Sequence, residues 1–402
     1  MDKNKYIGKK RNLIESENTN KDINNYNDDS INSTQNSNSE INSNRINIDK
    51  MYNDGIILDH HSHWVNKVLI LKNQPNHNLM SSSADSLIII YDNYPNYNPL
   101  LKIKLFGDSG VTYLTELKKG SIIACSFGAF KEIILNYNNE KNEFTYETIN
   151  YYTICTTYIS KCIELNNGNL LFISQQNIIN ILEKIKDNKG SKEKNKINDK
   201  FIKISTIYLL KYEICINILQ LKDNLYIAGS ITDTKYNILL KSSKKVNANY
   251  INFYDESFNI VHRINNIYCT KSQENIVKYN NDIVIVGIEM ILNEINWNNN
   301  KGIAVINYNN FQIISFYQVE NQISSILLYN NFLFIGNNKG YIDKYIIKDK
   351  EILLQKSKRV HFYNINSICC GNSYEKDLNE NLFVIFSGSN DNKIKALTYF
   401  KD

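Results

Sequence analysis

The strongest constraint on the fold of this 402-residue chain is a recurring unit of short apolar runs separated by polar turns. Each unit has an alternating apolar run, a turn, a second run ending on Ser or Gly, another turn and a further alternating run. Period-2 alternation over short runs indicates β-strands. The Ser and Gly anchors recur 43 to 57 residues apart, at Ser83, Ser126, Ser174, Ser230, Gly287, Gly336 and Ser389. This repetition predicts an all-β fold of seven similar units.

The first unit carries a more specific pattern. It contains, in order, His60-His61, Trp64-Val65, the run Ser81-Ser82-Ser83-Ala84-Asp85 and the closing pair Tyr91-Asp92. This layout resembles a blade of the WD-repeat β-propeller family, in which a Gly-His pair and a Trp-Asp pair bracket four strands. The resemblance is clear in residues 60–92 and 361–397 and degenerate in the repeats between them. It implies a seven-bladed β-propeller over residues 53–402.

The two ends of the repeat array predict how it closes. The seventh unit has three strands, and one spare apolar segment, Gly55-Ile56-Ile57-Leu58, lies just before the first unit. The family resemblance implies that this N-terminal strand completes the last blade. A closed array leaves only short, protected sheet edges. We therefore expect residues 55–58 to pair with the last strand of the chain.

Composition sets other segments apart from the repeats. Residues 1–52 are mainly Asn, Ser, Asp and Lys, which cannot bury enough apolar surface to offset chain entropy, so we expect a disordered Asn-rich tail. Three polar stretches within the repeats, 184–203, 234–249 and 289–300, are expected to be surface insertions. The stretch 184–203 holds eight lysines and three acidic residues, so its excess of positive charge equals the net charge of the whole chain, +5.

Seven residues of the two clear repeats resemble a catalytic set. They are His61, Ser83, Asp85, Tyr91, His361, Ser389 and Asp391. A Ser, a His and an Asp can form a nucleophilic triad. The family resemblance implies instead a structural hydrogen-bond network that runs from the His through the Asp and the Ser to an aromatic residue of the third strand, here Tyr91. Leu397 holds the aromatic position in the seventh repeat, so we expect that network to lack one member.

Few other residues are arranged for chemistry. His60, His61 and His63 lie close together, but a metal site would need further ligands, and the other histidines are scattered. The seven cysteines form no C-x-x-C pair, and the adjacent Cys369 and Cys370 point to opposite faces of a strand. No phosphate-binding glycine motif appears. We therefore expect no catalytic residue, no cofactor and no metal.

These observations favour a non-catalytic scaffold or adaptor subunit that binds protein partners in a multiprotein complex. Because a fold does not fix a function, this expectation depends on the family resemblance. Two alternatives stay open: a propeller-based hydrolase with its site at the channel mouth, and contact with RNA or a ribonucleoprotein through the Lys-rich stretch 184–203. Three features predict a cytoplasmic or nuclear protein without membrane insertion. The number of cysteines is odd, the N-terminus is polar, and the longest apolar run, Ile283–Leu292, is too short to span a membrane.

Overall fold

The computed structural model describes residues 55–402 except for 75, 94–95, 139, 142, 176–177, 187–198, 210–212, 233–249, 266, 271, 291–299, 349–350, 373–381 and 401–402. The described residues form strands and turns and no helix, which confirms the all-β prediction. No helix able to cross a membrane is found in this part of the chain. The expected tail, residues 1–52, lies outside the described residues, and so does most of each expected insertion.

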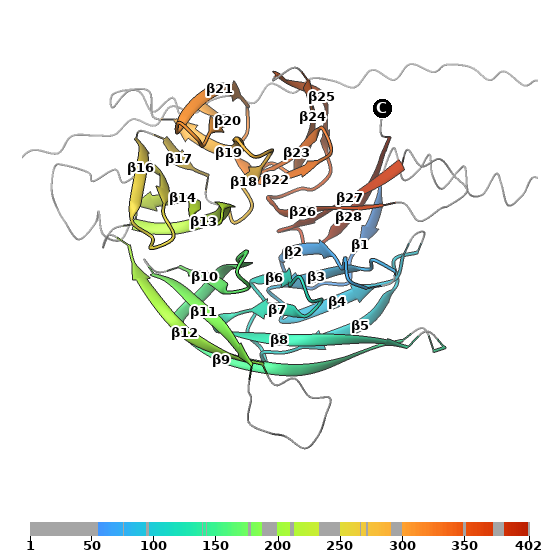
Figure 1. The fold of residues 1–402 in the computed structure, drawn as a ribbon. Helices are drawn as coiled ribbons and strands as arrows, with labels where there is room; N and C mark the ends of the chain where they lie inside the picture. The colour runs from blue at the N-terminus through green and yellow to red at the C-terminus, as the bar shows by residue number, and fades with distance from the viewer. Residues whose placement is uncertain are drawn as a thin grey trace, which may run out of the picture. The chain divides into compact units, whose positions relative to one another are not determined.

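Strands pair antiparallel, mostly with their neighbours in sequence, and the sheets follow one another around a common centre (Figure 1). One sheet comprises β2 Val65–Ile70, β3 Leu79–Ser83, β4 Leu87–Tyr91 and β5 Pro99–Lys104. The next has seven strands: β6 Tyr113–Glu116, β7 Ile122–Cys125, β8 Phe127–Asn138, β9 Glu143–Glu164, β10 Leu170–Ser174, β11 Ile178–Lys186 and β12 Asp199–Tyr208.

The remaining strands make four further sheets in the described part of the chain. One comprises β13 Glu213–Lys222, β14 Leu225–Thr232, β15 Tyr250–Tyr254 and β16 Ile260–Asn265. In the following one, β17 Ile267–Cys269 and β18 Ile276–Lys278 both pair with β19 Ile283–Met290, and β20 Asn300–Asn307 and β21 Gln312–Gln318 come after it. Another holds β22 Ile323–Tyr329, β23 Phe332–Asn337, β24 Tyr341–Lys348 and β25 Glu351–Arg359. The last holds β26 Ile365–Asn372, β27 Leu382–Ser389, β28 Ile394–Phe400 and β1 Ile56–Leu58.

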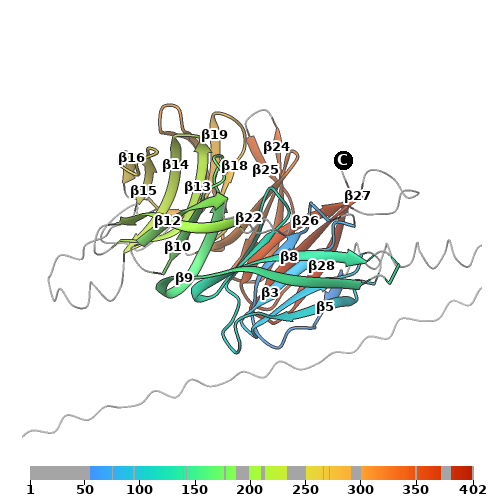
Figure 2. The same ribbon diagram turned by 60° about the horizontal axis from the view of Figure 1, so that its bottom comes forward.

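One long strand makes the second sheet larger than the others. β9 spans 22 residues and pairs with β8 as far as Tyr158, then with β10 from Ile159 onward. Figure 2 shows β8 and β9 as an extended hairpin along the side of the other strands. The first part of β9 was not predicted from the sequence, because residues 143–151 mix polar and aromatic side chains without an aliphatic alternation. Both halves of this sheet therefore share one continuous strand.

Two of the three expected insertions are flanked by strands that reach into the polar stretches, and the third, 234–249, lies outside the described residues. β11 continues to Lys186 and β12 begins at Asp199, so both ends of the stretch 184–203 are paired strands. β19 and β20 likewise remain paired at both ends of the stretch 289–300, with Glu289 opposite Lys301 and Met290 opposite Asn300. Polar composition marked these residues as loop, whereas a hairpin ladder can continue outward through polar residues because its backbone hydrogen bonds do not depend on side-chain type.

The short N-terminal strand lies at the edge of the last sheet. β1 pairs antiparallel with β28, with Ile56 opposite Ala396 and Leu58 opposite Ile394. Gly55, just before β1, has a φ of 75°. A Cβ atom at this position would lie 2.7 Å from Leu397 Cδ2 and 2.9 Å from the Ala396 carbonyl oxygen. Glycine is therefore favoured at position 55 for two reasons: it adopts the positive φ without strain, and it has no Cβ atom to obstruct the close approach of β1 to β28.

Buried apolar side chains gather in clusters between successive sheets. Within the seven-stranded sheet, Phe130 of β8 stacks on Phe172 of β10 with ring centroids 4.5 Å apart, so the two halves of that sheet also pack against each other. A further cluster joins the last sheet to the β2–β5 sheet and includes Leu58, Val65 and Phe386. Burying one such side chain contributes roughly 1.5–3 kcal/mol. The core is thus distributed over the contacts between sheets.

The contact of β1 with β28 can be tested at Gly55. Alanine there should destabilise the fold through both the positive φ and the contact with β28. Gly168 is the matched control, because its φ of 86° is similar but a Cβ would meet nothing within 4 Å. We expect Gly168→Ala to cost about 1–2 kcal/mol and Gly55→Ala to cost roughly 1–3 kcal/mol more. Urea unfolding measures both, and equal losses would show that β1 does not pack closely on β28.

Candidate functional site

A hydrogen-bond network ties the loop before β2 to the turn between β3 and β4. His61 is buried, and its Nδ1 lies 2.9 Å from Asp85 Oδ2 while its Nε2 lies 2.7 Å from Ser81 Oγ. The Asp85 carboxylate also accepts hydrogen bonds from the backbone N–H groups of Ser62 and Leu87, each at 2.9 Å. One carboxylate therefore holds two loops that are more than twenty residues apart in the chain.

Electrostatics favour the ionised form of this carboxylate. Burial alone would raise the pKa of Asp85, but the hydrogen bond and charge of His61, with the two backbone N–H donors, outweigh burial and lower the pKa to about 2. At the far end of the network the Tyr91 hydroxyl lies 3.5 Å from Ser81 Oγ, and burial raises the pKa of Tyr91 far above its ordinary value. The tyrosine therefore stays neutral.

The structure differs from the sequence-based expectation at the serine. Ser83 does not contact the imidazole; its Oγ accepts the N–H of Asp85 at 3.0 Å and donates to the carbonyl of His63 at 3.0 Å. Ser81 takes the expected place. Both serines lie on the same face of β3, but Ser83 is only two residues from Asp85 and therefore closes the turn. The sequence pattern could not distinguish two serines of the same face.

The last sheet repeats this arrangement with the same difference. His361 Nδ1 lies 2.9 Å from Asp391 Oδ2, and its Nε2 lies 2.9 Å from Ser387 Oγ. Ser389, the expected member, accepts the N–H of Asp391 at 3.3 Å instead. Leu397 is buried at the position that Tyr91 holds in the first network, and it brings no hydroxyl.

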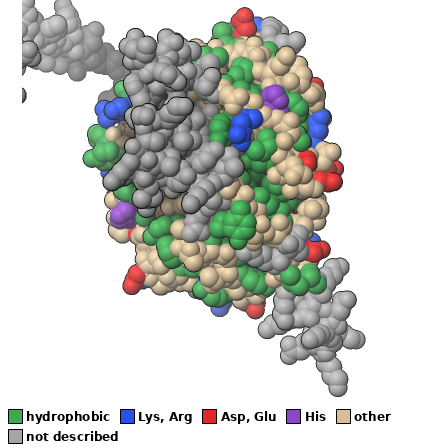
Figure 3. Space-filling view, turned by 90° about the vertical axis from the view of Figure 1, so that its left-hand side faces the viewer, with side chains coloured by type: hydrophobic (Ala, Val, Ile, Leu, Met, Phe, Trp, Pro, Cys, Tyr) green, Lys and Arg blue, Asp and Glu red, His purple; other side chains and the backbone are tan. Residues whose placement is uncertain are grey.

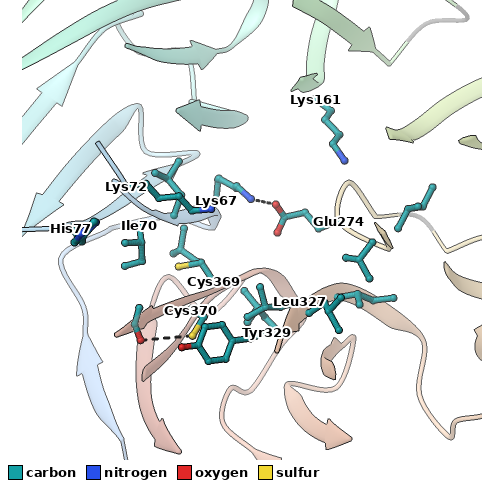
Figure 4. A pocket seen from close by; sticks show the side chains of 18 residues that line it. Lys67, Ile70, Lys72, His77, Lys161, Glu274, Leu327, Tyr329, Cys369 and Cys370 are labelled. Atoms are coloured by element: carbon teal, nitrogen blue, oxygen red, sulfur yellow. Dashed lines mark hydrogen bonds and ion pairs between the residues drawn. The ribbon is translucent and has the colours of Figure 1, made fainter. Parts of the chain in front are cut away.

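A second concentration of polar groups lies in a pocket among the innermost strands (Figure 4). Its volume is about 650 Å³. The lining residues include Lys67 of β2, Lys161 of β9, Glu274 before β18, Val277 of β18, Leu327 and Tyr329 of β22, and Cys369 of β26. The pocket thus draws on five sheets. The pocket was not predicted from the sequence. A lysine inside an apolar strand, as in both β2 and β9, is an unusual feature that could have indicated it.

Charged side chains line this pocket, and a chain of buried amides is bonded to one of them. Lys67 forms an ion pair with Glu274. Lys161 Nζ donates to Asn217 Oδ1 at 2.5 Å, Asn217 Nδ2 donates to Asn275 Oδ1 at 2.7 Å, and Asn275 Nδ2 donates to the Thr270 carbonyl at 2.6 Å. Burial lowers the pKa of Lys67 to about 8. Burial, reinforced by the positive charge of Lys67, lowers the pKa of Lys161 to about 7.

The remaining histidines, cysteines and lysines of interest do not form a further site among the described residues. His60, His61 and His63 do not converge, and the described residues contain no group of three His, Cys, Asp or Glu side chains that could hold a metal ion. All seven cysteines are free. Of the Lys-rich stretch, Lys184 forms an ion pair at 3.0 Å with the buried carboxylate of Glu132, so it is not a solvated loop lysine. Residues 187–198 lie outside the described part of the chain.

Comparison with known proteins gives matches in structure alone. No model of a known protein family and no curated protein matches the sequence. Among solved structures, the WD40 β-propeller domain of Doa1 is 10% identical with a TM-score of 0.59, covering 86% of this chain and 96% of that one. Sqt1 of Saccharomyces cerevisiae is 9% identical with a TM-score of 0.57 and coverages of 86% and 99%. A chain of the Mitotic Checkpoint Complex is 10% identical with a TM-score of 0.58 and coverages of 86% and 94%. The described fold is therefore a β-propeller of the WD40 type.

Acid should weaken the fold through Asp85. The pKa of Asp85 in the folded state lies below its ordinary value of 3.8, so the stabilisation is present above pH 4 and is lost as the pH falls toward 2. We expect a loss on the order of 1–2 kcal/mol over this interval. Urea unfolding at pH 2.5 to 5 measures the loss, and Asp85→Asn should flatten the profile. Asp108→Asn, at an exposed position, is the control, and an unchanged profile in Asp85→Asn would rule out this carboxylate as the acid-sensitive group.

The role of Ser81 can be separated from that of Ser83. Ser81→Ala leaves the buried Nε2 of His61 without its partner and should cost about 1–3 kcal/mol. It should also shift the ¹⁵Nε2 resonance of His61, whereas Ser83→Ala should leave that resonance in place. Two-dimensional NMR of the labelled imidazole provides the measurement. A shift of equal size in both variants would contradict the assignment of Ser81.

Proposed function

We propose that this chain is a seven-bladed WD-repeat propeller that acts as a non-catalytic scaffold, an adaptor subunit binding protein partners in a multiprotein complex. The observation that carries the proposal is a set of exposed aromatic side chains gathered at one end of the strands. The WD40-type fold supports it, because such a fold presents its loops on a stable frame. The free cysteines support work in a reducing compartment, the cytoplasm or the nucleus.

The blade count is supported by the division of the large sheet. The part of β9 that pairs with β8 can be the outer strand of a second blade, and the part from Ile159 onward the inner strand of a third. With this division the described strands fall into seven units, and in the fifth β17 and β18 pair with successive parts of β19 and so take one strand position. Closure by residues 55–58 is supported by the pairing of β1 with β28 and by the apolar cluster between the last sheet and the β2–β5 sheet. The domain limits that follow are a tail at 1–52 and a propeller at 53–402.

The connectivity explains why the aromatic side chains share one end. In an antiparallel unit, the loop that enters the first strand and the turn between the second and third strands lie at the same end of the sheet. Six exposed aromatic residues lie in such loops or on strand residues at this end of the sheets, and we call them the aromatic rim: Trp64, Phe127, Tyr158, Tyr208, Phe362 and Tyr363. Phe127 and Tyr158 meet edge to face, with centroids 5.0 Å apart. Asn392 Nδ2 donates to the Ser62 carbonyl at 3.2 Å, which joins the turn between β27 and β28 to the loop that carries Trp64. The N–H of Phe362 donates to Asp391 Oδ2 of the same turn at 3.2 Å.

Aromatic residues at such positions favour a protein partner. Trp64, Phe362 and Tyr363 expose 50%, 70% and 62% of their surface. Large aromatic side chains are enriched at the energetic centres of protein interfaces, because they bury much area with few rotatable bonds. Apolar side chains are also exposed on outer strands, for example Ile260 and Val261, but in the side view of Figure 3 such groups are interspersed with polar ones. The aromatic rim is therefore the surface that we assign to the partner.

The experiment is affinity purification of the tagged full chain followed by mass spectrometry and size-exclusion chromatography. We expect a stoichiometric multi-subunit complex from the unaltered chain. Combined Trp64→Ser, Phe362→Ser and Tyr363→Ser should release its other subunits while the melting temperature stays unchanged. The control is Leu353→Ser with Leu354→Ser, two exposed apolar residues on the edge strand β25, which should retain the complex.

Four outcomes would contradict the scaffold proposal. The unaltered chain could elute alone, or the β25 control could lose the complex as completely as the rim variant. A complex that dissolves with ribonuclease or moderate salt, and is lost on deletion of residues 187–198, would instead support the ribonucleoprotein alternative. Turnover of an ester by the purified chain would support the hydrolase alternative.

A further inference from the structure

The pocket among the innermost strands holds more positive than negative charge. Glu274 is the only carboxylate among the described residues that line it, and this carboxylate is paired with Lys67. Lys161 is only 7% exposed, and its ammonium group donates to a neutral amide oxygen, that of Asn217. A buried ammonium group loses its hydration, and an amide replaces only part of it. Lys161 is therefore suited to an additional, negatively charged partner.

The geometry holds Lys161 in a fixed position. Asn217, Asn275 and Thr270 form a buried hydrogen-bonded chain behind the ammonium group, which limits its rotation. Figure 4 shows Lys161 and the contacting pair of Lys67 and Glu274 on the wall of one pocket. The two lysines thus approach the same space from β9 and β2. Two amines around one space form a preorganised site for anionic oxygens, since charge-assisted hydrogen bonds are roughly twice as strong as neutral ones.

The rest of the pocket offers apolar surface. Ile70, Val277, Leu327 and Tyr329 are half-buried residues of its wall. A volume of about 650 Å³ lies within the range of small-molecule sites, which are mostly apolar with a few convergent polar groups. Lys72, at the end of β2, is a further positive charge among the lining residues. An anion with a compact apolar body matches both parts of this lining.

We propose that this pocket binds a small organic anion, with its carboxylate or phosphate group at Lys161 and Lys67 and its apolar body against Val277, Leu327 and Tyr329. This site is separate from the aromatic rim and goes beyond the scaffold function. Because burial lowers the pKa of Lys161 to about 7, a neighbouring anion also favours its charged form. The Lys67–Glu274 ion pair competes with the ligand for Lys67, so Glu274 limits the affinity for anions.

The test is isothermal titration calorimetry of the purified full chain at pH 6.5 with three probes that share one apolar body. They are 4-phenylbutyrate, 4-phenylbutyl phosphate and the neutral 4-phenylbutan-1-ol. We expect at least one anion to bind tenfold or more tightly than the alcohol, and the stronger of the two identifies the preferred head group. Lys161→Met should weaken that anion at least tenfold and leave the alcohol unchanged. Glu274→Gln should strengthen it several-fold by releasing Lys67.

The control is Lys344→Met, which removes another buried lysine, in β24, that does not line the pocket. It should leave the affinity for both anions unchanged. Equal binding of alcohol and anions, no heat from either anion at millimolar concentration, or unchanged affinity in Lys161→Met would overturn the proposal. If Lys161→Met does not fold, the comparison of anion with alcohol in the unaltered chain and the sign of the Glu274→Gln effect decide it. The titration contains no protein partner, so its failure and that of the scaffold proposal are distinguishable.

Discussion

The fold depends on apolar burial between neighbouring sheets. No single four-stranded sheet of this chain could bury its own apolar side chains, since each one presents them to the sheets on either side. Val65 of the β2–β5 sheet and Phe386 of the last sheet belong to one such buried cluster. Phe130 and Phe172 belong to another, which lies within the seven-stranded sheet. Every sheet therefore stabilises two others, and polar groups are left for the loops and for the innermost strands.

The innermost strands face a different constraint. Side chains from five sheets converge there, and several of them carry charges. Polar groups that become buried in such a set need hydrogen-bond or ion-pair partners. The ion pair of Lys67 with Glu274 and the chain from Lys161 through Asn217 provide such partners in part. The excess positive charge that remains separates this region from an ordinary apolar core, and it is the reason that we assign it a ligand.

Much of the fold could be predicted from the sequence, because period-2 alternation and Ser or Gly anchors report directly on strands and their turns. The all-β class and the position of most strands are confirmed, and residues 55–58 do pair with the last strand. The outer part of β9 could not be predicted, since its partly exposed side chains have no apolar alternation. Ser81 was missed in favour of Ser83 because local pattern does not tell which of two like residues on one face meets a distant imidazole. The pocket depends on contacts such as that of Lys67 with Glu274, which no local pattern encodes.

The pairing of β1 with β28 also bears on how the molecule is made. β1 is translated more than 300 residues before its partner strand β28. Until β28 has been translated, β1 and the apolar surface around Leu58 and Val65 have no cover in the nascent chain. Contacts of such long sequence separation form late and make folding slow. The pairing of β1 therefore has to wait for the synthesis of β28, and a chaperone that shields β1 during this interval would raise the yield of folded protein.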